Sequence, residues 1–381
     1  MSEDTPTFHR DESFEEPGSR AHIARLSQEG YQLLRENYVE DAEDRFREII
    51  TYDERNNYAL VGLGDAARKR GDCRTAVEHY SRCLEYHPDN NYALFGLADC
   101  YKSMRKFHRA IDVWEKYLEH DNENVTVLTR VADAHRKVRN FDRSKELYDR
   151  VLSIEEDNAY AIIGLAHLHY DFKDYENALY YWNWMLEKSG PRVDIRVLTS
   201  IGNCYRKLKR FDTAVEYFDR ALEREQGNFY ALFGLGDSYR GLGDPETALS
   251  YWNRILEKDA RNKVILTRAG DAYRALGHTN TAVDYYHRAL DLEFDAYAVL
   301  GLALISMDAG NYESAAESLH GLIRSAPREP RVYERLAECY LQLGRRGDAR
   351  SVLEEFPHQG KRNRRITEML ERLRGHGAER R

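Results

Sequence analysis

Hydrophobic residues recur along the chain at steps of three and four in short runs, and polar turns separate the runs. The first run in residues 57–90 places its apolar and small residues on one helical face (Leu60, Leu63, Gly64 and Ala67). Gly71 and Asp72 then interrupt the pattern, and a second run of the same period extends from Ala76 to Leu84. This pattern predicts two helices joined by a short turn.

The same two-run pattern returns at a nearly constant spacing. A small residue marks each copy, with successive spacings of 34, 34, 34, 34, 36, 34, 34, 33 and 34 residues (Ala42, Ala76, Ala110, Ser144, Ala178, Ala214, Ala248, Ala282, Ala315 and Ala349). The units run near 23–56, 57–90, 91–124, 125–158, 159–194, 195–228, 229–262, 263–295, 296–329 and 330–360. One hairpin buries too little apolar surface to be stable alone, so we predict that residues 21–360 stack into one helical solenoid.

The residues at fixed places in the unit carry a family resemblance. The pattern has a bulky residue at position 4, Leu at 7, Gly or Ala at 8, Tyr at 11, Ala at 20, an aromatic residue at 24, Ala at 27 and Pro at 32. Unit 195–228 fits nearly throughout (Leu198, Ile201, Gly202, Tyr205, Ala214, Phe218 and Ala221). The pattern resembles the tetratricopeptide repeat. It departs from it in the first unit, where Glu29 stands at position 7, and at position 32, where Pro survives only as Pro88 and Pro327.

This resemblance implies an all-α, right-handed superhelical solenoid of about ten helix-turn-helix repeats. In that family the first helices line the concave groove, and positions 2, 5, 6, 9, 12 and 13 point into it. The implied function is a non-catalytic scaffold that binds a peptide or protein segment in the groove.

A second period of two units lies over the first. Units that begin at 91, 159 and 229 open with NYALFGLA, AYAIIGLA and FYALFGLG and carry Trp at position 24, whereas the units between them carry Tyr or Phe there. We therefore expect the inner wall to alternate along its length. Unit 159–194 also has two extra residues around Ser189, Gly190 and Pro191, where we expect the local pitch to change.

The two ends differ from the repeats. Residues 1–20 are polar, with six acidic and two basic residues, and are typical of a disordered acidic tail. Residues 361–381 contain the segment KRNRRITEMLERLRG, whose apolar residues share one face. That segment predicts a helix that caps the last hairpin, followed by a basic tail.

An acid at position 9 and a base at position 12 recur through the units, and we call these residues the charge ladder. Because they stand three residues apart on a helix, each pair shares a face, and it is not the core face. Its members are Asp65 and Arg68, Asp99 and Lys102, Asp133 and Arg136, Asn203 and Arg206, Asp237 and Arg240, and Asp271 and Arg274. Each pair could simply stabilise its own helix by about 0.2–0.5 kcal/mol, or the ladder could hold an extended peptide.

The predicted groove residues are the ladder together with position 2 and position 6 (Tyr92, Tyr160 and Tyr230; Arg130 and Arg268). The two arginines could receive a carboxylate from a ligand. Exchanging Asp133 and Arg136 is expected to abolish partner binding while helicity stays intact.

Glycine at position 6 of five units lies in a helix interior, where it costs stability (Gly62, Gly96, Gly164, Gly234 and Gly301). Two explanations stand: the glycines open pockets beside the tyrosines at position 2, or they only admit a neighbouring side chain.

Composition excludes several classes of function. The net charge of −8 and the pI near 6.0 disfavour a phosphate-binding surface, and no apolar run is long enough to span a bilayer. Five cysteines without motif spacing predict neither disulfides nor zinc, and we expect them to be buried small residues in a cytoplasmic protein. No nucleotide loop or nucleophile motif occurs, so we expect no catalysis, cofactor or metal.

Two other classes of function remain as alternatives: an accessory or regulatory subunit of an enzyme or assembly complex, and a nucleic-acid-binding helical repeat. Chaperone-binding members of the family use Lys at position 5, but this chain has Val61, Phe95, Thr129, Ile163 and Phe233 there. A chaperone tail is therefore a poor candidate for the ligand.

Overall fold

The computed structural model describes residues 16, 18–325, 327–356 and 363–375, and over these residues the protein is entirely helical, with no strand. The chain divides into two compact units, each of several hairpins. We call Met1–Lys188 the first unit and Ser189–Arg381 the second unit, and a single copy of the repeated pattern is called a repeat. The division falls at the two-residue extension of unit 159–194.

In its described residues the first unit contains ten helices: α1 (Arg20–Arg35), α2 (Val39–Tyr52), α3 (Asn57–Lys69), α4 (Cys73–Tyr86), α5 (Asn91–Ser103), α6 (Phe107–His120), α7 (Val125–Lys137), α8 (Phe141–Ile154), α9 (Ala159–Asp171) and α10 (Tyr175–Ser189), the last of which ends one residue past the division. The second unit contains η1 (Gly190–Arg192), α11 (Ile195–Lys207), α12 (Phe211–Arg224), α13 (Phe229–Leu242), α14 (Pro245–Lys258), α15 (Lys263–Ala275), α16 (Thr279–Leu290), α17 (Ala296–Asp308), α18 (Tyr312–Ser325), α19 (Pro330–Gln342), α20 (Arg346–Glu354) and α21 (Arg364–Gly375).

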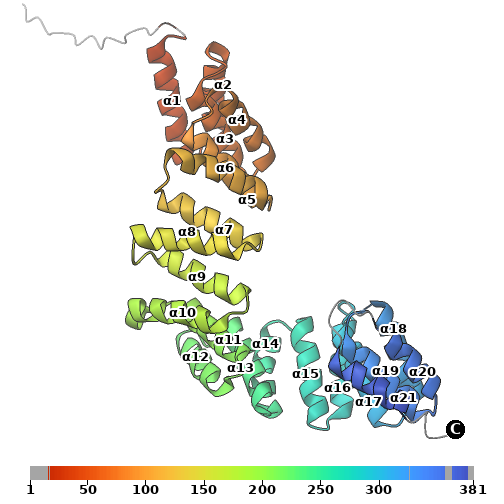
Figure 1. Ribbon diagram of the computed structural model, residues 1–381. Coiled ribbons are helices and arrows are strands. Elements are labelled where there is room, and N and C mark those ends of the chain that lie inside the picture. Colours follow the sequence, from red (N-terminus) through yellow and green to blue (C-terminus); the bar gives the residue numbers. More distant parts are fainter. Residues whose placement is uncertain (1–15, 17, 326, 357–362, 376–381) are drawn as a thin grey trace, which may run out of the picture. The chain divides into compact units, whose positions relative to one another are not determined.

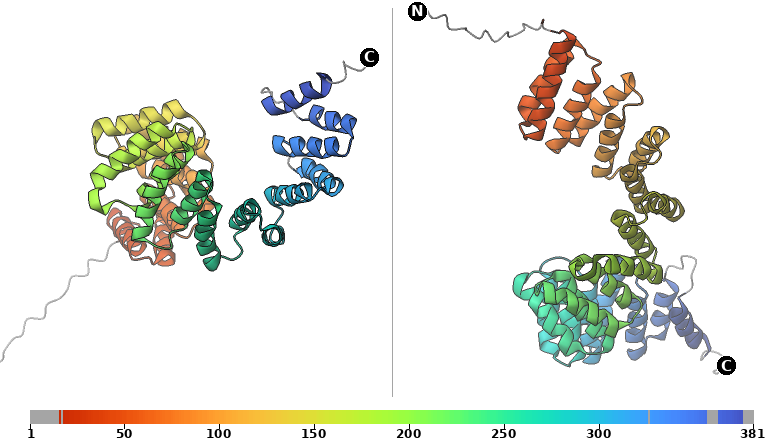
Figure 2. Two further views of the ribbon diagram at one scale, coloured as in Figure 1. Left: turned by 90° about the horizontal axis from the view of Figure 1, so that it is seen from below. Right: turned by 90° about the vertical axis from the view of Figure 1, so that its left-hand side faces the viewer.

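Successive helices pair as hairpins, α1 with α2, α3 with α4 and so on, and each hairpin packs on the next within its unit (Figure 1). Figure 2 gives two further views, in which the hairpins of each unit again lie side by side. The fold is therefore an all-α solenoid built from helical hairpins, as the repeat pattern predicts.

Local sequence signals set the ends of the first helix in each hairpin. Before α3, α5, α7 and α9 an asparagine accepts a hydrogen bond from the backbone N–H three residues on, as Asn56 does from Ala59 (3.1 Å) and Asn90 from Ala93 (2.9 Å). Position 15 of all ten hairpins has a positive φ, which ends the first helix with a left-handed residue. Glycine occupies this position in five hairpins, and Asn37, Arg105, Arg139, Lys173 and Lys209 occupy it in the others.

The aromatic residue at position 24 fills the centre of most hairpins. Phe46, Tyr80, Trp114 and Tyr148 are all fully buried in the first unit. Phe46 and Tyr80 lie close to the glycine at position 8 of their own hairpins: the Cβ of an alanine at Gly64 would meet Cε1 of Tyr80 at 2.5 Å. Large side chains at position 24 therefore need small ones at position 8, because the paired helices approach closely.

First helices of neighbouring hairpins contact one another, as α1 with α3 and α3 with α5 do, whereas among the described helices no second helix packs closely on the next second helix. The hairpins are thus closer together on the side of the first helices. That side is the inner face of each stack, and we call it the first-helix face.

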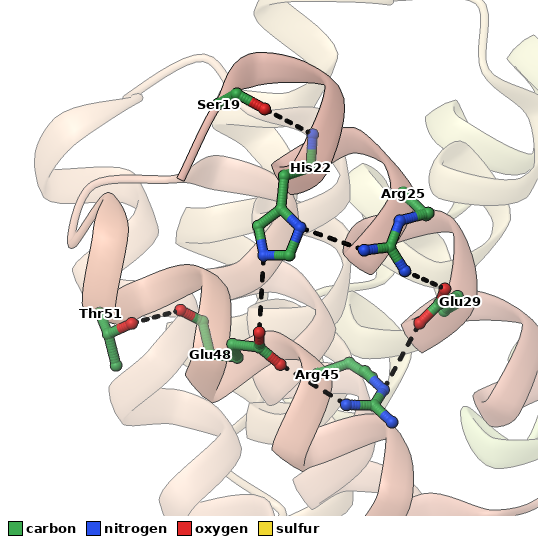
Figure 3. A network of polar contacts seen from close by, with 7 residues as sticks. All are labelled: Ser19, His22, Arg25, Glu29, Arg45, Glu48 and Thr51. Carbon is green, nitrogen blue, oxygen red and sulfur yellow. Dashed lines mark hydrogen bonds and ion pairs between the residues drawn. The ribbon is translucent and has the colours of Figure 1, made fainter. Parts of the chain in front are cut away.

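Ion pairs and hydrogen bonds join α1 and α2 of the first hairpin (Figure 3). Glu29, which occupies the usual leucine position 7, pairs with Arg25 of α1 (2.9 Å) and with Arg45 of α2 (3.5 Å). Arg25 also donates to Nδ1 of His22, so the ring proton lies on Nε2, which faces Glu48 at 3.5 Å. The Glu29 side chain is 40% exposed and pairs with two cations, so this acid is not buried in the core.

At the other end, α21 packs on α19 and α20 through Ile366 and Leu370, which join the apolar cluster of the last hairpins. Most of the predicted acidic tail (residues 1–15 and 17) and the end of the predicted basic tail (residues 376–381) lie outside the described residues. No helix among the described residues is long and apolar enough to cross a bilayer.

Candidate functional site: the first-helix face

The charge ladder is held by bonds within and between repeats. Tyr80, at position 24, donates to Asp65 at 2.7 Å, and Arg68 donates to both Asp65 (3.1 Å) and the Tyr80 oxygen (3.3 Å). Burial and the neighbouring Asp65 carboxylate raise the pKa of Tyr80 far above its ordinary value, so the phenol stays a donor. The same bond recurs between Tyr148 and Asp133 (2.8 Å) and between Tyr286 and Asp271 (2.7 Å).

Glycine at position 6 is explained by the ring at position 24 of the preceding repeat. A Cβ added to Gly96 would lie 2.4 Å from Cζ of Tyr80, and one added to Gly164 would lie 2.3 Å from Cζ of Tyr148. Gly62, Gly234 and Gly301 stand in the same relation to the preceding aromatic ring. The aromatic ring of the preceding repeat therefore fills the space beside each of these glycines. Of the two explanations, the one in which glycine admits a neighbouring side chain is correct, and no open pocket forms there.

Arginine replaces glycine at position 6 in two of the three repeats that follow a tryptophan repeat; the third has Ser200 there. Arg130 follows Trp114 and binds Asp99 of the preceding repeat at 2.6 Å, and Arg268 follows Trp252 and binds Asp237. The two arginines, which we expected to receive a ligand carboxylate, thus receive one from the chain itself. Each guanidinium also lies over a phenylalanine ring at position 5, Phe95 and Phe233 respectively.

Two kinds of junction follow from these contacts. First helices pack closely where position 6 is glycine (α1 with α3, α3 with α5, α7 with α9, α11 with α13 and α15 with α17). The arginine junctions, α5 to α7 and α13 to α15, are not among the closely packed pairs of described helices. From α3 onwards, the two-unit period in the sequence therefore corresponds, within each compact unit, to close junctions that alternate with open ones.

Arg136 shows how strongly some ladder residues are engaged. Its guanidinium pairs with Asp133 (3.3 Å) and with Asp171 of the next first helix (2.5 Å), and only 12% of its side chain is exposed. Burial lowers the pKa of Arg136, but Asp133 and Asp171 outweigh burial and raise the pKa overall. Exchanging Asp133 and Arg136 would break these bonds and the one to Tyr148. The exchange therefore cannot separate binding from folding as we expected.

Asp237 is the centre of the ladder in the second unit. Its side chain is 2% exposed and contacts three guanidinium groups, those of Arg206 (2.7 Å), Arg240 (3.3 Å) and Arg268. Asn203 accepts from Arg206 at 2.9 Å. Burial is the largest influence on Arg268 and lowers its pKa. Asp237 is thus a structural residue that no ligand can reach directly.

The remaining ladder residues are less engaged. Arg274 lies 4.0 Å from Asp308, and Lys102 makes no ion pair with any described residue. Burial raises the pKa of the Asp271 carboxyl, although its bond from Tyr286 acts in the opposite direction. The ladder is therefore a mixture of buried structural pairs and a few open cations.

Tyrosines at position 2 are the most exposed large side chains of the first-helix face. Tyr92 is 79% exposed and Tyr160 is 77% exposed, and Tyr58, Tyr230 and Tyr297 are more than half exposed. We call these five residues the tyrosine row. Tyr58 and Tyr92 line a cavity of about 740 Å³ with Tyr31, whose hydroxyl donates to the Tyr58 carbonyl oxygen at 3.0 Å.

Sequence reasoning missed part of this face. A second cavity, of about 1200 Å³, lies at the turn ends of α3, α5 and α7 and is lined by Arg74, Lys106 and Lys137, none of which we singled out. Cys73 also lines it and is half-buried, although we expected every cysteine to be buried; the other four are. The sequence signal that could have revealed this cavity is a basic residue at positions 13, 16 and 18 of successive repeats, where Lys137, Lys106 and Arg74 stand.

Two histidines of α9, His167 and His169, pack against aromatic rings. His167 meets the Trp182 ring edge-on at 4.9 Å, and His169 lies 2.9 Å from Asp174. Across the described part of the chain no three His, Cys, Asp or Glu side chains are grouped so that they could hold a metal.

Comparison with known proteins gives one consistent result. Family models described as tetratricopeptide repeat match residues 61–124, 129–190 and 267–319, residues 195–228, residues 230–261 and residues 306–373. Together these ranges cover most of the chain. No curated protein sequence matches it.

Solved structures are similar to this chain at low sequence identity. A tetratricopeptide repeat protein from Parabacteroides merdae is 16% identical, with a TM-score of 0.52 over 66% of this chain and 99% of that chain. Yeast Tom70 is 15% identical, with a TM-score of 0.46 over 94% of this chain and 96% of that chain. At such identity the likeness concerns the fold alone.

Proposed function

This chain belongs to the tetratricopeptide repeat family, and on that basis we propose that it is a non-catalytic scaffold that binds a protein segment along its first-helix face. Repeats of this family imply protein partners. The residues that carry the contact in this proposal are the tyrosine row, because they are the large side chains that the fold leaves in solvent on this face.

The exposure of the tyrosine row is the observation that carries the proposal. An exposed tyrosine offers a rigid apolar ring and a polar hydroxyl, and such residues dominate the binding energy of many interfaces. Tyr58, Tyr92, Tyr160, Tyr230 and Tyr297 recur at one position of the repeat. The charge ladder then has two roles: its buried pairs join the first helices that carry the tyrosines within each compact unit, and its open cations supply polar contacts at the edge.

The cavity between Tyr31, Tyr58 and Tyr92 is where a bound segment would be most enclosed. Its volume of about 740 Å³ lies within the usual range of 300–1,000 Å³ for ligand pockets. Asn56, Asn57 and Asn90 also line it and can hydrogen-bond a peptide backbone.

A display selection tests the proposal. The full chain is panned against a random-peptide library, and selected peptides are titrated by fluorescence anisotropy against the chain, against Tyr58→Ala/Tyr92→Ala and against Tyr180→Ala. Tyr180 is the control because it is 62% exposed but lies on the second helix α10. We expect the first variant to bind about tenfold or more weakly and the control to bind within about twofold of the natural chain. Peptides that bind both variants as well as the natural chain would contradict the proposal.

A further inference from the structure

The cavity at the open junction between α5 and α7 is strongly basic although the whole chain is acidic. Six basic side chains line it (Arg68, Arg74, Lys102, Lys106, Arg130 and Lys137), against two carboxylates. The net charge of the chain is −8. The positive charge is therefore concentrated locally.

Both carboxylates in the cavity are already bound. Asp99 pairs with Arg130 at 2.6 Å, and Asp72 accepts the backbone N–H groups of Arg74 and Thr75 at the start of α4 (3.2 Å each). Arg68 is bound to Asp65.

Four cations of the cavity have no counter-ion among the described residues: Arg74, Lys102, Lys106 and Lys137. These side chains come from three successive hairpins, at α4, α5, the start of α6 and α7. Like charges gathered in a cleft raise the local potential and attract an oppositely charged ligand.

We propose that this cavity, which we call the basic cavity, binds an acidic peptide segment of a partner protein; this inference rests on the proposed function and adds the chemistry of the ligand. The volume of about 1200 Å³ exceeds that of ordinary small-molecule pockets and accommodates several residues of an extended chain. Phe107 and Met104 also line the basic cavity and offer apolar contact to the parts of the peptide that lie between its carboxylates. A nucleic acid is disfavoured because Phe107 is the one aromatic side chain that lines the basic cavity, so bases have no row of rings on which to stack.

The probe for the test is a fluorescein-labelled peptide, Gly-Ser-Glu-Glu-Asp-Glu-Glu-Ser-Gly, with a Gln/Asn analogue as the neutral control. Binding to the full chain is measured by anisotropy at 50 and 300 mM NaCl. We expect the acidic peptide to bind at least tenfold more tightly than the analogue and to weaken at the higher salt concentration, because screening shortens the reach of the charges. Lys102→Gln/Lys137→Gln is expected to bind it at least fivefold more weakly. Lys116→Gln/Lys207→Gln removes the same charge elsewhere and should bind as the natural chain does.

Alkylation of Cys73 by neutral iodoacetamide locates the bound peptide. Cys73 lines the basic cavity and is half-buried, whereas the other four cysteines are buried. The acidic peptide should slow alkylation of Cys73 in proportion to its occupancy, and the neutral analogue should not.

Several results would overturn the inference: equal binding of both peptides, equal binding by the two lysine variants, or unprotected Cys73.

Protection of Cys73 by a twelve-nucleotide oligothymidylate at lower concentrations than the peptide would assign the cavity to nucleic acid instead. A variant in which the six acidic residues of 1–16 are replaced by Asn or Gln gives the last control. If Cys73 of this variant is alkylated faster than that of the natural chain with no peptide present, the basic cavity would be assigned to the chain's own N-terminal segment. If these tests fail while library-selected peptides still require Tyr58 and Tyr92, the proposed function stands and only this inference falls.

Discussion

Tyr80 donates a 2.7 Å hydrogen bond to Asp65, and the ring that carries this hydroxyl lies against Gly96 of the next repeat. One side chain thus links the core of its hairpin, the charge on the first-helix face and the junction with the following hairpin. Because the same tyrosine binds the acid at position 9 and lies against the glycine at position 6 of the next repeat, the residues at positions 24, 9 and 6 depend on one another.

Gly96→Ala tests the close junction. The added methyl carbon would lie 2.4 Å from Cζ of Tyr80, a ring that Asp65 holds in place, so the helices must separate. We expect a loss of about 1–3 kcal/mol of unfolding free energy in urea denaturation. Gly321→Ala in α18 is the control: nothing lies within 4 Å of that Cβ, and helix propensity predicts a gain of about 0.5–1 kcal/mol. Equal effects at the two sites would refute this account of the glycines.

Asp237→Asn tests the buried part of the charge ladder. The substitution keeps the shape of the side chain but removes the charge that three guanidinium groups share. We expect it to cost about 3–5 kcal/mol, because buried cations lose their partner. Asp44→Asn removes an exposed partner of Arg47 and should cost about 0–1 kcal/mol. A small effect at Asp237 would mean that this carboxylate does not hold the repeats together.

Lys209→Gly tests the turn geometry at position 15. Lys209 has a φ of 61°, which strains a residue with a Cβ but not glycine. After the greater entropy of an unfolded glycine is deducted, we expect a gain of about 0.5–1 kcal/mol in unfolding free energy. Lys207→Gly, two residues earlier at the end of α11, should lose a similar amount. Destabilisation by both changes would show that the turn does not impose the left-handed conformation.

Asp244→Asn tests the acid sensitivity of a helix cap. Hydrogen bonds from the Thr247 side chain and from backbone N–H groups lower the pKa of Asp244. A lowered pKa means that the stabilising effect is complete above the ordinary aspartate pKa of about 3.9 and is lost as pH falls through the lower folded value. Asparagine also caps helices but does not titrate. The variant should therefore lose less stability than the natural chain between pH 6 and pH 3, and parallel losses would contradict this role for Asp244.

The sequence predicted the hairpins because their signals are local. Position 8 is small and position 24 is large in unit 229–262, for example, where Gly236 meets Trp252. The spacing of acid and base also predicted helix-internal pairs, and the Asp65–Arg68 and Asp133–Arg136 pairs do form.

The shorter bonds of the charge ladder could not be predicted in the same way. Asp99 binds Arg130, which is 31 residues away, and Asp133 binds Tyr148 across the hairpin. These contacts depend on how closely packed helices approach, within a hairpin for Tyr148 and between hairpins for Arg130, and residue spacing along one helix does not give that distance. The basic cavity was missed for the same reason, since its cations come from three hairpins and are far apart in sequence.

Site-specific photo-crosslinking at Tyr92 tests the central claim, that the tyrosine row contacts the partner, most directly. Tyr92 is replaced by p-benzoyl-phenylalanine in the full chain, with Tyr160 as a second site on the same face and Tyr180 on a second helix as the control. We predict that one partner protein is crosslinked at both Tyr92 and Tyr160 and not at Tyr180. Partner capture that persists while crosslinks form only at Tyr180 would contradict the claim.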